Sequence, residues 1–215
     1  MKRFIATLLL GASLTGSCGY ATAADLAIAP VVDAPPVQPS IYVQLLGGFT
    51  AALDVDYYLD VDTPLSLETE AGFVIAGTLG VVVMDGLSLE ADVMYAKRGY
   101  TDPYPDDTSA SISLMGNVKY TAALNDQFSA YGAVGVGFIK LGEYGAADDK
   151  TYDFEGAGYQ FILGASMEVA QNTSLVTEVR YQNTFQPSDY TGDDGYPYTV
   201  QAPTASALVG LKFGF

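Results

Sequence analysis

The sequence predicts an all-β protein, an eight-stranded antiparallel up-and-down β-barrel that crosses a membrane. The 215-residue chain is rich in apolar residues, with a mean hydropathy of +0.21. Past the N-terminus, however, it has no run of the ~18 apolar residues that a membrane helix needs. Its apolar residues instead alternate with small and polar ones in eight stretches, and the connections between these stretches alternate between long and short.

The eight stretches have the two-residue period of a β-strand, and each is about as long as the ~9–11 residues of a tilted membrane strand. They are Ile41–Thr50, Gly72–Met84, Leu87–Gly99, Ser109–Ala122, Phe128–Leu141, Ala157–Val169, Ser174–Gln182 and Ala205–Phe215. Backbone polar groups in lipid must be paired, so strands in a membrane have to close into a barrel.

Four connections are long and three are short. The long ones are Ala51–Ala71, Tyr100–Thr108, Gly142–Gly156 and Asn183–Thr204, and the short ones centre on Asp85-Gly86, Asn125-Asp126 and Gln171-Asn172. In outer-membrane barrels the long loops face the outside and the short turns face the periplasm. The sequence therefore predicts four long extracellular loops, three short periplasmic turns, and both ends of residues 41–215 on the periplasmic side.

The first 40 residues lie outside this pattern. Two cations precede an apolar stretch that is too short to span a membrane, and small residues follow at a cleavage site, so residues 1–23 are predicted to be a cleaved signal peptide. Residues 24–40 hold four prolines and predict an extended periplasmic tether. Cys18 is the only cysteine, and two interpretations stay open: a lipidation site, or a signal-peptide residue lost on cleavage.

Aromatic residues on the apolar, outward parity of the strands gather at two levels. Near the long loops they are Phe49, Phe73, Tyr95, Phe138, Tyr159 and Tyr181, and near the short turns they include Tyr120 and Phe128. Two aromatic belts are typical of membrane barrels, whereas a soluble sandwich has no reason to sort its aromatics this way. The outward exceptions, Lys97 and Lys140, lie near loop ends, where a long cation can reach the headgroups.

The sequence resembles the small eight-stranded outer-membrane β-barrels of Gram-negative bacteria: the OmpA-type membrane domain, the opacity proteins and the alphaproteobacterial porin-family surface antigens. The resemblance covers residues 41–215 and is carried by stretches such as IYVQLLGGF (41–49), YGAVGVGF (131–138) and ALVGLKFGF (207–215). It implies location in the outer membrane, among lipid and lipopolysaccharide. It also implies that Val209, Leu211, Phe213 and Phe215 form the signal that the barrel-assembly machinery recognises.

The inward parity of the strands holds eight charged residues, four of each sign: Glu90, Asp92, Arg98, Lys119, Glu168, Glu178, Arg180 and Lys212. Eight strands leave an interior that side chains just fill, so the charges would have to pair with one another. The alternative is a polar, narrow pore. Inward-facing glycines, Gly135 and Gly164 among them, could leave small water pockets.

The predicted long loops are acidic and interleaved with tyrosines. The cluster Asp54, Asp56, Asp60 and Asp62 offers oxygen ligands for a hard cation such as Ca²⁺, but its spacing is not that of an EF-hand. Two other interpretations are an adhesive, tyrosine-rich surface that meets an extracellular ligand or host surface, and simple solubility with charge repulsion. The acidic balance of −16 makes nucleic acid an unsuitable partner.

The chain contains no histidine, so the histidine-based nucleophile and zinc arrangements are excluded. We therefore expect no enzymatic activity and no cofactor. The sequence predicts a monomeric barrel with a structural role in the envelope and a surface that interacts with the environment. The alternative function is a narrow passive channel for small solutes.

Overall fold

The computed structural model describes residues 40–51, 53–59, 65–101, 106–145, 150–186, 188–191 and 197–215. The predicted signal peptide, Cys18 and all of the predicted tether except Ser40 lie outside the described residues. No helix among the described residues is long and apolar enough to span a membrane.

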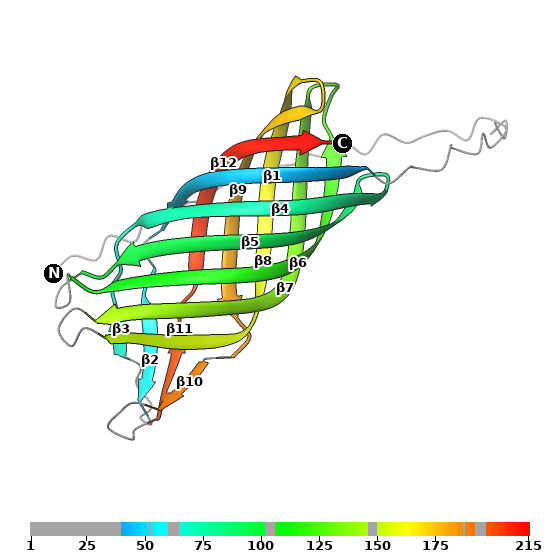
Figure 1. Cartoon of the computed structure of the whole chain (residues 1–215). Helices are drawn as coiled ribbons and strands as arrows, with labels where there is room; N and C mark the ends of the chain where they lie inside the picture. The colour runs from blue at the N-terminus through cyan, green and yellow to red at the C-terminus, as the bar shows by residue number, and fades with distance from the viewer. Residues whose placement is uncertain are drawn as a thin grey trace, which may run out of the picture. The chain divides into compact units, whose positions relative to one another are not determined.

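Eight antiparallel strands close into a barrel (Figure 1). They are β1 (Ile41–Thr50), β4 (Gly72–Met84), β5 (Leu87–Gly99), β6 (Thr108–Ala123), β7 (Phe128–Gly145), β8 (Lys150–Ala170), β9 (Thr173–Thr184) and β12 (Thr204–Gly214). Each strand pairs with its neighbours along the barrel, and β1 pairs with both β4 and β12. The predicted eight-stranded up-and-down barrel is confirmed.

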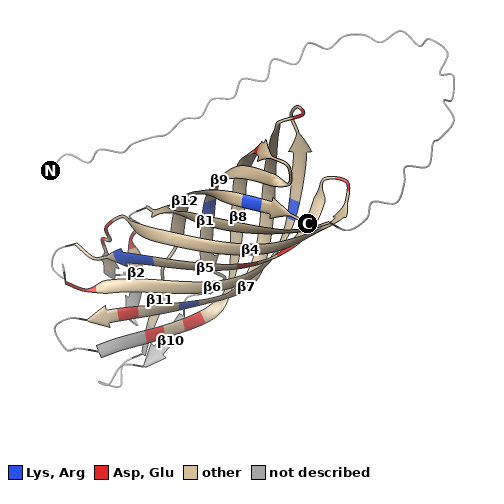
Figure 2. Ribbon diagram, turned by 45° about the horizontal axis from the view of Figure 1, so that its top comes forward, with Lys and Arg blue, Asp and Glu red and all other residues tan. Residues whose placement is uncertain are grey.

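The barrel closes where β1 meets β12, with Tyr42 opposite Gly214 and Thr50 opposite Ser206. Its outward face carries exposed apolar side chains, such as Leu45 and Val136, and its inward face carries buried ones. Charged residues on the strands are few, and most of the ribbon is neutral (Figure 2). This sorting follows from the two-residue period of a strand, since alternate side chains point to opposite faces.

Local turn chemistry explains the three short turns. Gly86 and Asn172 both adopt positive φ, at 71° and 59°, which glycine and asparagine tolerate better than other residues. In the turn between β6 and β7, the Asn125 side-chain oxygen accepts hydrogen bonds from the backbone N–H groups of Gln127 and Phe128, at 2.9 and 2.8 Å. These side-chain to backbone bonds replace strand pairing where the chain reverses.

The loop end of the barrel is more ordered than the sequence predicts. The predicted long loop Gly142–Gly156 is wrong for most of its length, because β7 continues to Gly145 and β8 begins at Lys150. The two strands stay paired up to Gly145 and Lys150. On the β8 side the alternation continues, since Phe154 is buried between the exposed Asp153 and Glu155, whereas on the β7 side the buried Glu143 interrupts it.

Two other predicted loops contain a second sheet. Short strands β2 (Val55–Leu59), β3 (Leu65–Leu67), β10 (Ser188–Thr191) and β11 (Pro197–Gln201) form a four-stranded sheet in the order β10-β11-β2-β3. The first and last long connections therefore fold together, and this small sheet lies at the loop end of the barrel (Figure 1). We call it the loop sheet.

Candidate functional site: the barrel interior and its loop-end cap

Arg180 on β9 forms ion pairs with two acids inside the barrel. Its guanidinium donates to Glu178 at 2.6 Å and to both carboxylate oxygens of Asp92, on β5, at 2.9 and 3.0 Å. Asp92 also accepts a 2.6 Å hydrogen bond from the Thr78 hydroxyl. The three charged side chains are almost completely buried, so each charge depends on its partners in place of water.

Lys119 on β6 forms a second buried ion pair. Its ammonium contacts the Glu90 carboxylate and lies over the rings of Tyr42 and Tyr131, 4.5 and 4.9 Å from the ring centres. The two tyrosine hydroxyls donate to the acids of the network, Tyr42 to Glu90 and Tyr131 to Glu178, both at 2.7 Å. The tyrosines therefore connect the Lys119 pair to the Arg180 pair.

The same tyrosines fill the space that inward-facing glycines leave. A Cβ atom at Gly80 would lie 2.1 Å from the Tyr42 ring, and one at Gly164 would lie 2.3 Å from the Tyr131 ring. A Cβ at Gly135 would meet the Asn117 side chain at 1.9 Å. The expectation that Gly135 and Gly164 leave water pockets is wrong, because larger side chains from other strands occupy those positions.

A layer of uncharged polar side chains follows towards the loop end. Gln182 donates to Ser113 at 3.1 Å and to Gln160 at 2.8 Å, and Gln160 donates to Asn117 at 2.5 Å. These residues are buried and come from strands β6, β8 and β9. The chain of amides continues the side-chain filling of the interior beyond the charged layer.

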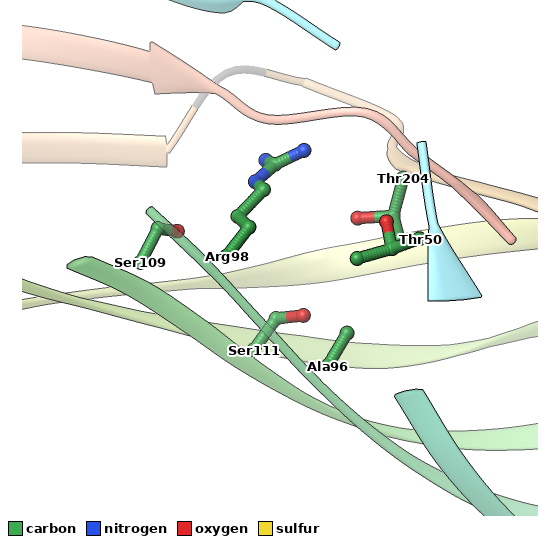
Figure 3. Close-up of a pocket in the computed structure, with 6 residues that line it drawn as sticks. All are labelled: Thr50, Ala96, Arg98, Ser109, Ser111 and Thr204. Carbon is green, nitrogen blue, oxygen red and sulfur yellow. The ribbon is translucent and has the colours of Figure 1, made fainter. Parts of the chain in front are cut away.

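A narrow pocket lies beyond this layer (Figure 3). It is too narrow to hold a water molecule, and it is lined by Thr50, Ala96, Arg98, Ser109, Ser111 and Thr204. Arg98 donates to the Pro203 carbonyl at 3.1 Å, on the connection that leads into β12. Arg98 therefore ties the barrel wall to the loop end.

An apolar core lies at this end of the interior. It joins Val55 and Val200 of the loop sheet to Tyr100, Leu141 and Phe154 at the ends of barrel strands. Val55 and Val200 are 0% and 2% exposed. We call this core and the loop sheet above it the loop-end cap.

The cap also contains a buried acid that the sequence reading placed in an exposed loop. The Tyr100 hydroxyl donates to the Glu143 carboxylate at 2.6 Å, and Glu143 is buried. Because β7 extends past Leu141, Glu143 keeps the inward parity of its strand.

The opposite end of the interior is more open. Lys212 is half-buried and lies 5.8 Å from the centre of the Tyr42 ring, whereas Glu168 is exposed at the turn end of β8. The structure therefore divides the eight predicted interior charges. Glu90, Asp92, Lys119, Glu178 and Arg180 form one bonded cluster, which we call the central charge cluster, and Arg98, Glu168 and Lys212 lie nearer the two ends.

Sequence reasoning missed the uncharged members of this network. Tyr42, Gln44, Thr78 and Tyr131 all contact the central charge cluster, and Gln44 donates to Glu178 at 3.3 Å. They share the inward parity of their strands, so the alternation itself was the signal that could have identified them.

The comparisons with known proteins agree with this architecture. The family model described as "Outer membrane protein beta-barrel domain" matches residues 18–213. The chain belongs to the outer-membrane β-barrel family. No curated protein matches its sequence. The family match places the protein in the outer membrane of a Gram-negative bacterium.

Solved outer-membrane barrels share the fold at low sequence identity. Neisserial surface protein A is 14% identical with a TM-score of 0.56, over 83% of this chain and 99% of that one. OprG from Pseudomonas aeruginosa is 12% identical with a TM-score of 0.58, over 82% and 95%. A major outer membrane protein from Thermus thermophilus is 14% identical with a TM-score of 0.50, over 82% and 99%.

In this outer-membrane barrel the predicted girdle aromatics lie on the outward face. Phe49, Phe73, Phe138, Tyr181, Tyr120 and Phe128 are exposed, and Tyr95 and Tyr159 are partly exposed. Tyr159 packs against three other rings, with centroid distances of 5.6 Å to Phe161, 6.3 Å to Tyr181 and 5.3 Å to Phe185. At the C-terminus, Val209, Leu211 and Phe215 are exposed and Phe213 is partly exposed.

The predicted cation cluster is only partly visible. Asp60 and Asp62 lie outside the described residues. Asp54 is exposed, and Asp56 accepts a 2.5 Å hydrogen bond from the Ser66 hydroxyl across the β2–β3 pair. Within the described part of the chain, no group of three or more acids, histidines or cysteines is arranged to hold a metal ion.

Proposed function

We propose that the protein is a non-conducting structural barrel of the outer membrane, with a filled interior and an acidic surface at its extracellular end. The central charge cluster carries this proposal. Five buried charges from β5, β6 and β9 are held by direct contacts among themselves and with Tyr42 and Tyr131. Side chains that satisfy one another across the lumen stabilise the closed barrel and occupy the path that an ion would need.

The loop-end cap supports the same conclusion. A conducting pore needs a hydrated entrance, but Val55 and Val200 pack against Leu141 and Phe154 at the loop end. An apolar core excludes water, and opening it would expose side chains that are now buried.

Planar-bilayer conductance of the refolded protein tests the proposal. The wild type and the double variant Glu178→Gln/Arg180→Ala are compared, and a shift in migration on boiling in SDS first shows that both are folded. We expect no discrete conductance steps in the wild type. Reproducible steps that change in the variant would overturn the structural role and establish the alternative, a narrow passive channel for small solutes.

We also propose that the extracellular end meets partners outside the cell. The described part of this end exposes the acids Asp54, Glu68, Glu70 and Asp106. Because the loop sheet packs on the barrel, Asp54, Glu68 and Glu70 beside it lie on an ordered surface, which lowers the entropy cost of binding. Binding of whole cells to host surfaces, with and without Ca²⁺, is the test, and loss of binding in a variant with four acid-to-amide changes is the expected result. Equal binding by the variant would remove this part of the proposal.

A further inference from the structure

The two outward-facing cations of the barrel lie close together on one side. Lys97 on β5 and Lys140 on β7 are both exposed, and both lie near the loop ends of their strands. The other cations with described side chains, Arg98, Lys119, Arg180 and Lys212, have the inward parity. The membrane-facing surface of the described strands therefore concentrates its positive charge on either side of β6, at the level of the outer leaflet.

Ala110 and Ile112 of β6 lie between the two lysines, with Ala110 opposite Lys97 and Ile112 opposite Lys140. Lys97 pairs with Ala110 of β6, and Ala110 pairs with Gly142 of β7, two residues beyond Lys140. Neighbouring strands are about 4.8 Å apart, and the two lysines are offset by two residues along β6, so their Cα atoms are separated by roughly 12 Å. Two long, flexible lysine side chains that start from these positions can both reach one phosphate above Ala110 and Gly142.

Carboxylates border this position on one side. Lys140 pairs with Asp153 at 2.8 Å, but both side chains are about half exposed, and an exposed pair of this kind is weak and easily exchanged. Asp153 and Glu155 both lie on β8, beyond Lys140, and Lys97 lies two strands away on the opposite side. A phosphate is therefore favoured on the β5–β6 side, away from these acids.

Apolar grooves run down the barrel wall from Lys140. The first, of about 560 Å³, is lined by Lys140, Ile112, Leu114, Phe138 and Val93, with Glu155 at its upper edge. Two more, of about 620 and 500 Å³, continue along β6 to β8 and share Val118, Val134 and Phe161. No charged side chain lines these last two grooves.

The floor of the second groove is open because of Gly116. A Cβ atom added there would have its nearest neighbour at 3.9 Å, so a side chain could be accommodated without moving the barrel. Tyr159 and Phe161 form the raised wall on the β8 side. The surface thus offers a cationic position at the headgroup level and, below it, a channel-shaped apolar track for a hydrocarbon chain.

We propose that this face of β5 to β8 is a binding site for lipopolysaccharide. Lys97 and Lys140 hold a phosphate of its lipid A, and an acyl chain lies in the grooves over Gly116. Lipopolysaccharide is the occupant because both cations lie at the extracellular level of the barrel, where the outer leaflet presents a phosphorylated lipid. The site needs only the outer-membrane location and is independent of whether the barrel conducts.

The test is lipid binding to the purified, detergent-folded barrel, measured by native mass spectrometry. The probes are diphosphorylated lipid A, its dephosphorylated form, and phosphatidylglycerol as an anionic lipid of another class. We expect Lys97→Gln/Lys140→Gln to weaken binding of diphosphorylated lipid A by at least about tenfold, since it removes two charge-assisted contacts. Asp153→Asn should strengthen binding, because it removes the acid that competes for Lys140.

Matched glycine variants test the groove. Gly116→Phe fills the proposed track, whereas Gly77→Phe places the same side chain at an equally open, outward-facing position on β4, outside the site. We expect only Gly116→Phe to weaken lipid A binding, by several-fold, while both variants keep heat-dependent migration in SDS. Equal binding by wild type and the double lysine variant, or equal loss with phosphatidylglycerol, would overturn the proposal, as would equal effects of the two glycine variants.

Discussion

Arg180 is the side chain on which the barrel interior depends most directly. Arg180→Ala leaves Asp92 and Glu178 buried without their cation, and removal of one partner from a buried ion pair costs about 3–5 kcal/mol. We expect urea unfolding in lipid vesicles, followed by migration in SDS, to show a loss of this size. Lys140→Ala, which breaks the half-exposed pair with Asp153, is the control and should cost less than about 1 kcal/mol.

Neutralising Asp92 and Glu178 distinguishes the cost of unpaired buried charge from the cost of lost packing around Arg180. In an Asp92→Asn/Glu178→Gln/Arg180→Ala variant neither acid is left as an unpaired buried charge, so part of the lost unfolding free energy should return. If the triple variant were as unstable as Arg180→Ala alone, the loss would come from the cavity and not from the unpaired carboxylates.

Gly80 and Gly77 face opposite sides of the same strand. Gly80→Ala would place a Cβ 2.1 Å from the Tyr42 ring, and overpacking of this kind costs about 1–3 kcal/mol. Gly77→Ala meets only ordinary contact at 3.9 Å and should change the unfolding free energy by less than about 0.5 kcal/mol. Chemical unfolding of both variants checks this, and equal effects would mean that Tyr42 can move aside.

At the scale of elements, the contacts that stabilise the loop-end cap are not the ones that close the barrel. Val55→Asp would place a charge in the apolar core beside Leu141 and Phe154, so we expect the loop sheet to open while the eight barrel strands stay closed. Limited proteolysis should then cut within residues 51–71 or 185–203 and leave a heat-modifiable barrel. Asp54→Asn, beside it on the exposed surface, is the control and should keep the wild-type pattern.

Some elements follow from the sequence and others do not. The strands Ile41–Thr50, Gly72–Met84 and Leu87–Gly99 were predicted to the residue, because strict alternation ends at the tight turn around Gly86 or at an acidic connection. The loop sheet was not predicted. Its central pairing joins β2 to β11, and no local pattern in either segment specifies a partner so far away in sequence.

In the interior, too, some features follow from the sequence and others do not. Parity predicted that Glu90, Asp92, Lys119, Glu178 and Arg180 face inward, but it could not say which acid each cation meets. That choice depends on how strand register and barrel shear bring side chains together, as with Arg180 of β9 and Asp92 of β5. Glu168 has the inward parity of β8, but it is exposed because it lies at the turn end of the strand.

At the scale of the whole molecule, Phe215 is expected to act in assembly more than in stability. The residue is 80% exposed, although its backbone N–H donates to the Ile41 carbonyl at 2.8 Å. Phe215→Ala should therefore lower the amount of barrel inserted in cells, while refolding of the purified protein in detergent stays unchanged. Quantifying the heat-modifiable form in outer-membrane fractions measures the first effect. An equal loss in detergent would assign the residue a stabilising role instead.

The pairing of β1 with β12 has a consequence for how the protein is made. The first barrel strand cannot satisfy the hydrogen bonds on one of its edges until the last one arrives, so every incomplete product carries two unpaired edges. A polypeptide crossing the periplasm must therefore be protected from aggregation through these edges until its whole length has been exported. The seam makes barrel formation a test of completeness, because a copy truncated before β12 lacks the strand that pairs with β1.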